Sequence, residues 1–583
     1  MKALKLSLCF SRRTVSTLLL WFVFITFLEA FTVYFISQER YVYAWDYATY
    51  YNPYISINNL AKTGIANFSR EIFLSFRYDY NLLAVVPLLL FRILFGPSRI
   101  SYIVATLTIY TFPSMILFTI MVKKAASQIT QNAHFIHFAS IITLLINPFF
   151  LVGLYLGFVD VFGVGIICFI YARYFLSRNT KSVTDHVLLG FILTLLMLFR
   201  RGYGFWITSF LFVYFGFQVG DLLLIRDFHF SHIIQALGKP ILTGFIFVIL
   251  LFLLAHPIAQ KAFFENYATI YDAFRDRPIL SFVEGLYFNS GPVPIALLFI
   301  GIIIGFSVKK LRRFSLFIII QAILTLLMLI RVQNVMDHQY YFFYPAILFF
   351  ITLPFLFLFR QPFRPMRYGI ITLFLLYSVI NFNVILIPGM DRRIGPIRLA
   401  FSAQTHYPLV RQDLKEIGRL VKTLSELNTK KPGNIYIFSI SNDYNNAIFR
   451  NYCNMYTDLA QFCSRILWSN DIDKRDGFPL QLLTATYIVV PDTNVFLIGK
   501  KQHVVEDLIT DFLSSGPLSQ SFIKLPYRFV FDNDTIAYIF VKNSTISSSV
   551  IGALSKKFEY YYPNNPLFIF SATQINQHDS YRQ

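Results

Sequence analysis

Charged residues are scarce in this sequence. They make up 14% of its 583 residues, whereas hydrophobic residues make up 56% and aromatic residues 18%. A soluble globular domain carries about 25% charged residues, so this composition excludes one and indicates a polytopic membrane protein. The formal net charge of +20 does not indicate a nucleic-acid partner. The basic residues lie singly or in short groups between apolar runs, where they orient helices.

Motifs for nucleotide, zinc or redox chemistry are also missing. The sequence contains no P-loop and no GxGxxG motif, and none of its four cysteines form a CxxC pair. Cys9 and Cys168 are isolated, whereas Cys453 and Cys463 both lie in the C-terminal part. These two cysteines could pair in an oxidising compartment, and the alternative is that both are simply buried thiols.

Long apolar runs occupy most of the first 390 residues. Residues 1–13 are basic and lead into an apolar run without a small-residue cleavage site, which predicts a retained signal-anchor helix. The run at 82–95 contains Pro87 and Arg92 and is expected to lie on or dip into the outer leaflet, because counting it as a crossing would invert every later loop. We therefore expect about eleven transmembrane helices, at roughly 14–36, 99–122, 134–152, 158–176, 186–199, 205–223, 240–257, 291–308, 314–331, 340–359 and 367–387.

The charged residues predict which side of the membrane each loop faces. The shorter loops on the side of the N-terminus hold most of the basic residues of this region, which makes that side cytoplasmic. Examples are Lys123, Lys124, Lys309, Lys310, Arg312 and Arg313. Most acidic residues fall on the opposite side, although orientation does not need them there. We therefore infer that chemistry or binding takes place on the outer face.

After residue 391 the composition changes to that of a soluble domain. The periodicity predicts a helix at 412–427, strands at 434–439 and 482–491, a helix at 504–513 and a hairpin at 527–541. Strands that alternate with helices indicate an α/β domain, and an odd number of crossings places it outside the cytoplasm. The predicted organisation is a transmembrane module over 1–391, whose first outer loop, 37–98, carries juxtamembrane helices, and an extracytoplasmic α/β domain over 392–583.

Asp46 is the first candidate catalytic residue. It lies in the aromatic stretch SQERYVYAWDYATYY (37–51), which follows the first span directly. A carboxylate at this depth could accept a proton from an attacking hydroxyl or hold a divalent cation against a phosphate. Alternatively, it caps an interfacial helix or pairs with a basic residue. Glu39 is a weaker candidate, because an acid beside Arg40 at a helix end is usually a surface pair.

Asp160, Arg200 and Arg201 are further candidates. Asp160, in LYLGFVDVFGVG, could form a two-carboxylate rim with Asp46, or it could cap the following helix. Arg200 and Arg201 precede a flexible Gly202 at the expected depth of the outer headgroups. Two guanidinium groups there could bind a lipid phosphate bidentately, and the alternative is ordinary snorkelling to phospholipid headgroups.

Arg331 and the segment DHQYYFFYP (337–345) form another polar outer region. Arg331 and His338 could bind the same phosphate. His338 could instead protonate a leaving group, although a histidine beside an aspartate is more often structural. Glu29 lies inside the first span, so it should bond to a neighbouring helix or face a cavity. The loop 259–290 could cover the site as a lid or form a simple surface helix.

The order of these segments resembles the GT-C superfamily of integral-membrane glycosyltransferases, in particular its bacterial mannosyltransferase-like and aminoarabinose-transferase-like branch. The segments that carry the resemblance are YAWDYATYY (43–51), the outer acid Asp160, LFRRGYGFW (198–206), DHQYYFFYP (337–345) and the terminal outer domain. The resemblance implies transfer of a sugar from a polyprenyl-phosphate donor to a hydroxyl group of a lipid, glycan or protein acceptor. It also implies a multi-pass protein of the bacterial inner membrane.

The resemblance assigns roles to individual residues as well. It implies that Asp46 is a general base or a metal ligand, and that Arg200 and Arg201 hold the donor phosphate. This chain has WDY where relatives have paired acids such as DE or DxD. A single carboxylate is a poor cage for Mg²⁺ or Mn²⁺, so a divalent cation, held by Asp46 and Asp160 if it is present, stays an open prediction.

Three other functions fit a polytopic membrane protein. A transporter or lipid flippase is expected to show inverted repeats, and the sequence contains none. A non-catalytic protein of cell-envelope assembly would act through its C-terminal domain alone. An enzyme similar to O-antigen ligases would have a large outer loop between late spans in place of a terminal domain.

Overall fold

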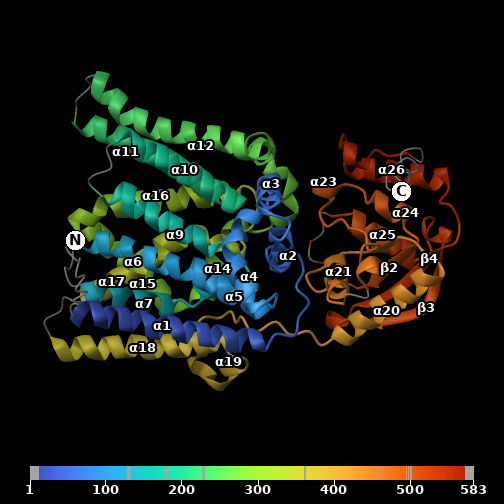
Figure 1. Ribbon diagram of the computed structural model, residues 1–583, viewed down its shortest axis with the longest axis horizontal. Coiled ribbons are helices and arrows are strands. Elements are labelled where there is room, and N and C mark those ends of the chain that lie inside the picture. Colours follow the sequence, from blue (N-terminus) through green and yellow to red (C-terminus); the bar gives the residue numbers. More distant parts are fainter. Residues whose placement is uncertain are drawn as a thin grey trace, which may run out of the picture. The chain divides into compact units, whose positions relative to one another are not determined.

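The computed structural model contains two compact units (Figure 1). It describes residues 12–127, 133–177, 182–225, 230–359, 363–456, 459–493, 495–496, 498 and 502–571. The basic residues 1–11, with Cys9, lie outside the described residues. The helical unit comprises Met1–Glu39, Thr49–Glu265 and Arg277–Pro408. The C-terminal unit comprises Arg40–Ala48, Asn266–Asp276 and Leu409–Gln583.

The helical unit consists of apolar helices that run side by side in Figure 1. In a bilayer only a helix satisfies every backbone polar group within its own segment, so apolar runs of this length fold as helices. α10 packs against α12, α15 against α17, and α6 against α9. The helices are α1 (Arg12–Ser37), α5 (Arg99–Thr106), α6 (Phe112–Ala126), α7 (Ala133–Ile146), α8 (Phe149–Leu156), α9 (Val161–Ile170), α10 (Val183–Phe199), α11 (Gly204–Ile225), α12 (Phe230–Phe264), α14 (Pro278–Ser290), α15 (Pro292–Ser307), α16 (Lys309–Ile330), α17 (Tyr344–Leu358) and α18 (Arg364–Leu386).

Six helices among the described residues are long and apolar enough to cross a membrane, or up to eight if each of two bent pairs is one span. The sequence had predicted about eleven crossings, and the remaining apolar segments form helices of 10–17 residues. Proline explains both bends, because it lacks an N–H group and ends the preceding helix. α7 and α8 meet at 64° before Pro148, and α14 and α15 meet at 109° before Pro292.

Short helices follow α1, and their juxtamembrane position stays a prediction. They comprise α2 (Tyr51–Ala61), α3 (Ile65–Ser75) and α4 (Leu89–Phe95). The run at 82–95 forms two short 3₁₀ turns and then α4, whose seven residues span only about 10 Å. It therefore does not form a straight crossing, which fits the expectation from the sequence. Glu29 on α1 accepts a hydrogen bond from the hydroxyl of Thr108 at 3.2 Å, so this half-buried acid does bond to a neighbouring helix.

The C-terminal unit is built on a four-stranded mixed sheet of order β1-β2-β4-β3. β1 (Ile435–Ile437) pairs in parallel with β2 (Tyr487–Asp492), while β4 (Ile536–Lys542) pairs antiparallel with β2 and β3 (Phe522–Val530). The larger helices of this unit are α20 (Leu414–Lys430), α21 (Asn446–Asn454), α25 (Val504–Leu513) and α26 (Ser548–Tyr561), and single turns form α22 (Ala460–Cys463), α23 (Asp473–Asp476) and α24 (Leu480–Thr484). The predicted fold class, a polytopic helical protein with a C-terminal α/β domain, is confirmed.

Two segments from the first part of the sequence pack within the C-terminal unit. The segment 40–48 joins it through the backbone, because Arg40 N–H donates to Leu409 and Arg411 N–H donates to Arg40. The segment 266–276 contains α13 (Tyr267–Ile270), which contacts α23. The loop 259–290 is therefore not one surface helix, because its middle packs with the C-terminal unit and its last part forms α14.

Cys453 and Cys463 form a disulfide in this unit, whereas Cys168 is a buried free thiol. The pairing that the sequence left open is thus present. We expect an alkylating reagent added to the unfolded, unreduced protein to modify Cys168 and to leave Cys453 and Cys463 unmodified until a reductant is added. Peptide mass spectrometry measures this, with Cys168 as the internal control. Modification of Cys453 without reduction would contradict the disulfide.

Candidate active site

Asp160 and Arg200 form a buried ion pair in the helical unit. Arg200 Nε donates to Asp160 Oδ1 at 3.1 Å, and the two side chains are 9% and 0% exposed. Asp160 stands at the start of α9 and Arg200 directly after α10. The Asp160 side chain does not cap α9, so the capping role considered from the sequence is wrong. A guanidinium at this depth needs a counter-charge, and Asp160 supplies it.

Tyrosine side chains surround this ion pair. The hydroxyl of Tyr203 donates to the backbone oxygen of Asp160 at 2.5 Å. A Cβ atom at Gly163 would overlap the Tyr203 ring, so this glycine allows α9 to approach the turn after α10. The guanidinium of Arg200 lies 4.7 Å from the ring centroid of Tyr80, within the range of a cation–π contact. The position of Arg200 is therefore fixed by both charge and stacking.

Arg201, the second arginine of the turn, pairs with Asp79. Its Nη1 lies 2.5 Å from Asp79 Oδ2, and the two side chains are 24% and 27% exposed. Nearby, the Asn81 amide donates to the backbone oxygen of Leu198 at 2.5 Å. Residues 79–81, which follow α3, thus pack onto residues 198–203, which we call the LFRRGY turn. The two arginines differ in environment, because Arg200 is buried and Arg201 is reachable from solvent.

Side chains of α5 hold the connection between α8 and α9. Gly157 ends α8 with φ +95°, and its backbone oxygen accepts from the hydroxyl of Tyr102 at 2.7 Å. Arg99 Nη2 donates to the backbone oxygen of Tyr155 at 3.3 Å. A Cβ atom at Gly157 would lie 2.7 Å from the Arg99 guanidinium nitrogens, so glycine is needed here for space as well as for backbone conformation.

His338 lies against the same connection. Its ring centroid is 5.0 Å from that of Phe158, two residues before Asp160. Burial raises the pKa of the neighbouring carboxyl of Asp337. Arg331 follows the last residue of α16 and is exposed. The structure thus brings Asp160, Arg200, Arg201 and His338 onto adjoining turns of the helical unit.

Asp46 belongs to the C-terminal unit, in the short 3₁₀ turn Trp45–Tyr47, where it is half-buried. Trp45 has φ +45°, a conformation that a bulky residue rarely adopts and that marks functional segments more often than ordinary loops. Asp160 belongs to the helical unit. A two-carboxylate rim of Asp46 and Asp160 therefore stays a prediction.

Asp79, Tyr80 and Asn81 were not predicted from the sequence as site residues. The only signal in the sequence is a short polar group, DYN, between two apolar juxtamembrane segments. Among the described residues, no three His, Cys, Asp or Glu side chains lie close enough to hold a metal ion. One oxygen of Asp160, Oδ2, is buried and accepts no hydrogen bond within the part of the chain that the structure describes. A divalent cation stays a prediction.

The fold and these contacts define a polytopic helical membrane protein with paired acids and arginines on adjoining turns, and with a C-terminal α/β domain. No family model and no curated protein matches the chain. A solved structure similar to it is the crystal structure of ArnT from Cupriavidus metallidurans bound to undecaprenyl phosphate, at 13% identity and a TM-score of 0.47, covering 89% of this chain and 98% of that chain.

Proposed function

We propose that this chain is a GT-C-type membrane glycosyltransferase that transfers a sugar from a polyprenyl-phosphate donor to a hydroxyl acceptor at the outer face of the membrane. The observation that carries this proposal is the LFRRGY turn, where a buried Arg200–Asp160 pair stands next to a partly exposed Arg201–Asp79 pair. A phosphate oxygen that replaced Asp79 would keep the Arg201 guanidinium in a charge-assisted hydrogen bond.

The proposed reaction needs one cationic and one basic group. The acceptor oxygen attacks the anomeric carbon, and the bond from that carbon to the phosphate oxygen breaks. Polyprenyl phosphate leaves with an additional negative charge, which the Arg201 guanidinium stabilises. The acceptor hydroxyl loses its proton to a general base, for which we propose Asp46. Arg200, which is paired with Asp160, holds the turn in place.

Two observations support a reaction at the outer face of the membrane. The disulfide between Cys453 and Cys463 is typical of an oxidising compartment, so it favours a C-terminal unit outside the cytoplasm. The short basic loops favour the same orientation. We propose the inner membrane of a bacterium, with a hydroxyl group of a lipid, glycan or protein as the acceptor.

Replacement of Arg201 tests the phosphate site. We expect Arg201→Ala to weaken binding of undecaprenyl phosphate at least tenfold, because charge-assisted hydrogen bonds contribute about 1.5–3 kcal/mol each. Arg201→Lys should fall between wild type and Arg201→Ala, since lysine keeps the charge and loses the planar fork. Binding is measured with radiolabelled undecaprenyl phosphate and protein reconstituted in nanodiscs.

Arg313→Ala is the matched control for this experiment. Arg313 also pairs with an aspartate, Asp221, and is also partly exposed, but it lies at the opposite, cytoplasmic end that the charge pattern predicts. We expect this variant to bind as the wild type does. If Arg201→Ala binds undecaprenyl phosphate as tightly as Arg313→Ala does, the LFRRGY turn is not the phosphate site.

A further inference from the structure

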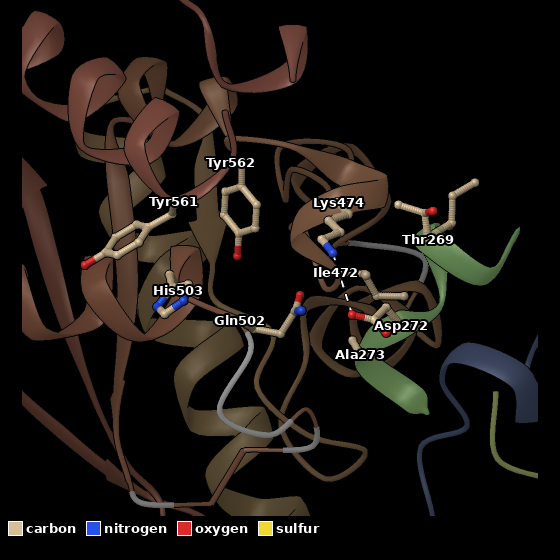
Figure 2. Close-up of a pocket in the computed structure, with 10 residues that line it drawn as sticks. Thr269, Asp272, Ala273, Ile472, Lys474, Gln502, His503, Tyr561 and Tyr562 are labelled. Atoms are coloured by element: carbon tan, nitrogen blue, oxygen red, sulfur yellow. Dashed lines mark ion pairs between the residues drawn. The ribbon is translucent and has the colours of Figure 1, made fainter. Parts of the chain in front are cut away.

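A cavity of about 270 Å³ lies within the C-terminal unit, among residues for which the glycosyltransferase proposal has no role (Figure 2). Its walls come from four parts of the chain: α13 with the residues after it, the turn α23, the residues at the start of α25, and the end of α26. This volume is just below the range of about 300–1,000 Å³ typical of small-molecule sites, so it suits one ring-sized group.

One side of the cavity carries a balanced pair of charges. Lys474 Nζ lies 3.6 Å from Asp272 Oδ2, and Figure 2 shows both side chains beside Thr269. A carboxylate only accepts hydrogen bonds and an ammonium only donates them, so a hydroxyl group placed between the two can do both. The opposite charges cancel, and this side therefore favours no ion of either sign.

The opposite side of the cavity is aromatic. The rings of His503 and Tyr561 stack with centroids 4.2 Å apart and an interplanar angle of 9°. Figure 2 shows this stack across the cavity from Lys474 and Asp272, with Gln502 between the two sides. A flat aromatic surface that faces hydrogen-bonding side chains suits a ligand with one apolar face and a rim of hydroxyl groups.

A carboxylate of the chain already binds the helix N-terminus that lies at this cavity. The N-terminus of α25 is a natural anion site, but Asp473 Oδ2 accepts from the backbone N–H groups of His503 and Val504 at 2.7 and 3.1 Å. The hydroxyl of Tyr562 donates to the same oxygen. Asp272 pairs with both Lys474 and Arg275, at 3.6 and 3.4 Å, so a phosphate or nucleotide would meet two carboxylates, Asp272 and Asp473, against two cations that already have a partner. This charge balance disfavours an anionic ligand and favours a neutral one.

We propose that this cavity is a binding subsite for a neutral sugar residue. An outer face of the His503–Tyr561 stack packs against one face of the sugar ring, while Asp272, Lys474 and Gln502 bond to its hydroxyl groups. This proposal rests on the proposed function in one respect, because it makes the acceptor a glycan whose sugar is held by the C-terminal unit. The wall that α13 and Asp272 contribute comes from the chain between two membrane helices, α12 and α14.

Saccharide binding to the full chain tests the subsite. The protein is reconstituted in nanodiscs free of glycolipids and sugar detergents, and methyl glycosides of hexoses and N-acetylhexosamines are titrated by calorimetry and saturation-transfer NMR. We expect saturable binding of at least one of them. Tyr561→Ala should weaken it about tenfold, because loss of an aromatic stack and its apolar contact costs roughly 1.4 kcal/mol.

A second variant and a control keep the test independent of folding. Thr269 is exposed at the rim, so Thr269→Trp should block the cavity and abolish binding without disturbing the core. Tyr527→Ala, an exposed tyrosine on β3 that does not line the cavity, should bind as the wild type does. The absence of saturable binding by every glycoside, or equal binding by Thr269→Trp and Tyr527→Ala, would overturn the subsite.

The same preparations separate this proposal from the proposed function. A chain that releases sugar from a polyprenyl-phosphate donor, yet binds no glycoside through Tyr561, is a transferase without this subsite. A chain that binds a glycoside through Tyr561, yet turns over no donor, has the subsite without the transfer reaction.

Discussion

Asp160→Asn is expected to destabilise the helical unit by about 3–5 kcal/mol, the cost of removing one partner from a buried ion pair. The side chain of Arg200 is only 9% exposed, so it cannot reach water to recover the lost interaction. The hydrogen bond from Tyr203 goes to the backbone oxygen of Asp160 and should survive the change. The loss of stability therefore measures the contribution of the Asp160 charge and not a loss of the surrounding packing.

Reversible unfolding of the purified protein in mixed micelles measures this difference. Asp221→Asn is the matched control, because it breaks the Arg313–Asp221 pair at an exposed position and should cost at most about 1 kcal/mol. The double variant Asp160→Asn/Arg200→Met should recover much of the loss, since apolar residues often replace a buried pair without penalty. Equal stabilities of Asp160→Asn and Asp221→Asn would show that the buried pair is not formed.

The architecture was predictable because membrane helices follow from apolar length and composition alone. The LFRRGY turn and Asp160 could be named for the same reason, since polar residues stand out at the ends of apolar runs. The lengths of the helices were less predictable than their positions. A window of apolar residues does not register the bends at Pro148 and Pro292, and it does not separate the long helices from the shorter apolar ones.

The partners of the named residues could not be predicted. Asp79 is more than 120 positions before Arg201 in the sequence, and no local pattern links the two residues. The Arg200–Asp160 pair was not predictable either, because its residues lie 40 positions apart and each suggested a separate function. The assignment of residues 40–48 to the C-terminal unit depends on backbone bonds to residues 409–411, which are also distant in sequence. Tertiary pairing of this kind is invisible to periodicity and composition.

Asp46→Asn is expected to lower the rate of sugar transfer about 10²–10⁴-fold, the usual contribution of a general base. Asparagine has nearly the shape of aspartate but cannot accept the proton of the acceptor hydroxyl. The turn that holds Asp46 should persist, because the positive φ belongs to Trp45 and the backbone bonds of this turn are unchanged. Binding of undecaprenyl phosphate, which we assign to Arg201, should therefore stay at the wild-type level while turnover falls.

Release of radiolabelled sugar from a polyprenyl-phosphate donor pool measures turnover. Asp534→Asn is the matched control, because it is also an aspartate of the C-terminal unit, exposed in the turn between β3 and β4. It should transfer sugar at the wild-type rate. A chelator distinguishes the two roles of Asp46: a base keeps the wild-type enzyme active in EDTA, whereas a loss of activity that Mn²⁺ restores would assign Asp46 to a cation. If Asp46→Asn turns over donor as fast as Asp534→Asn does, Asp46 takes no part in the reaction, and the base must be sought among the acids of the helical unit, beginning with Asp79.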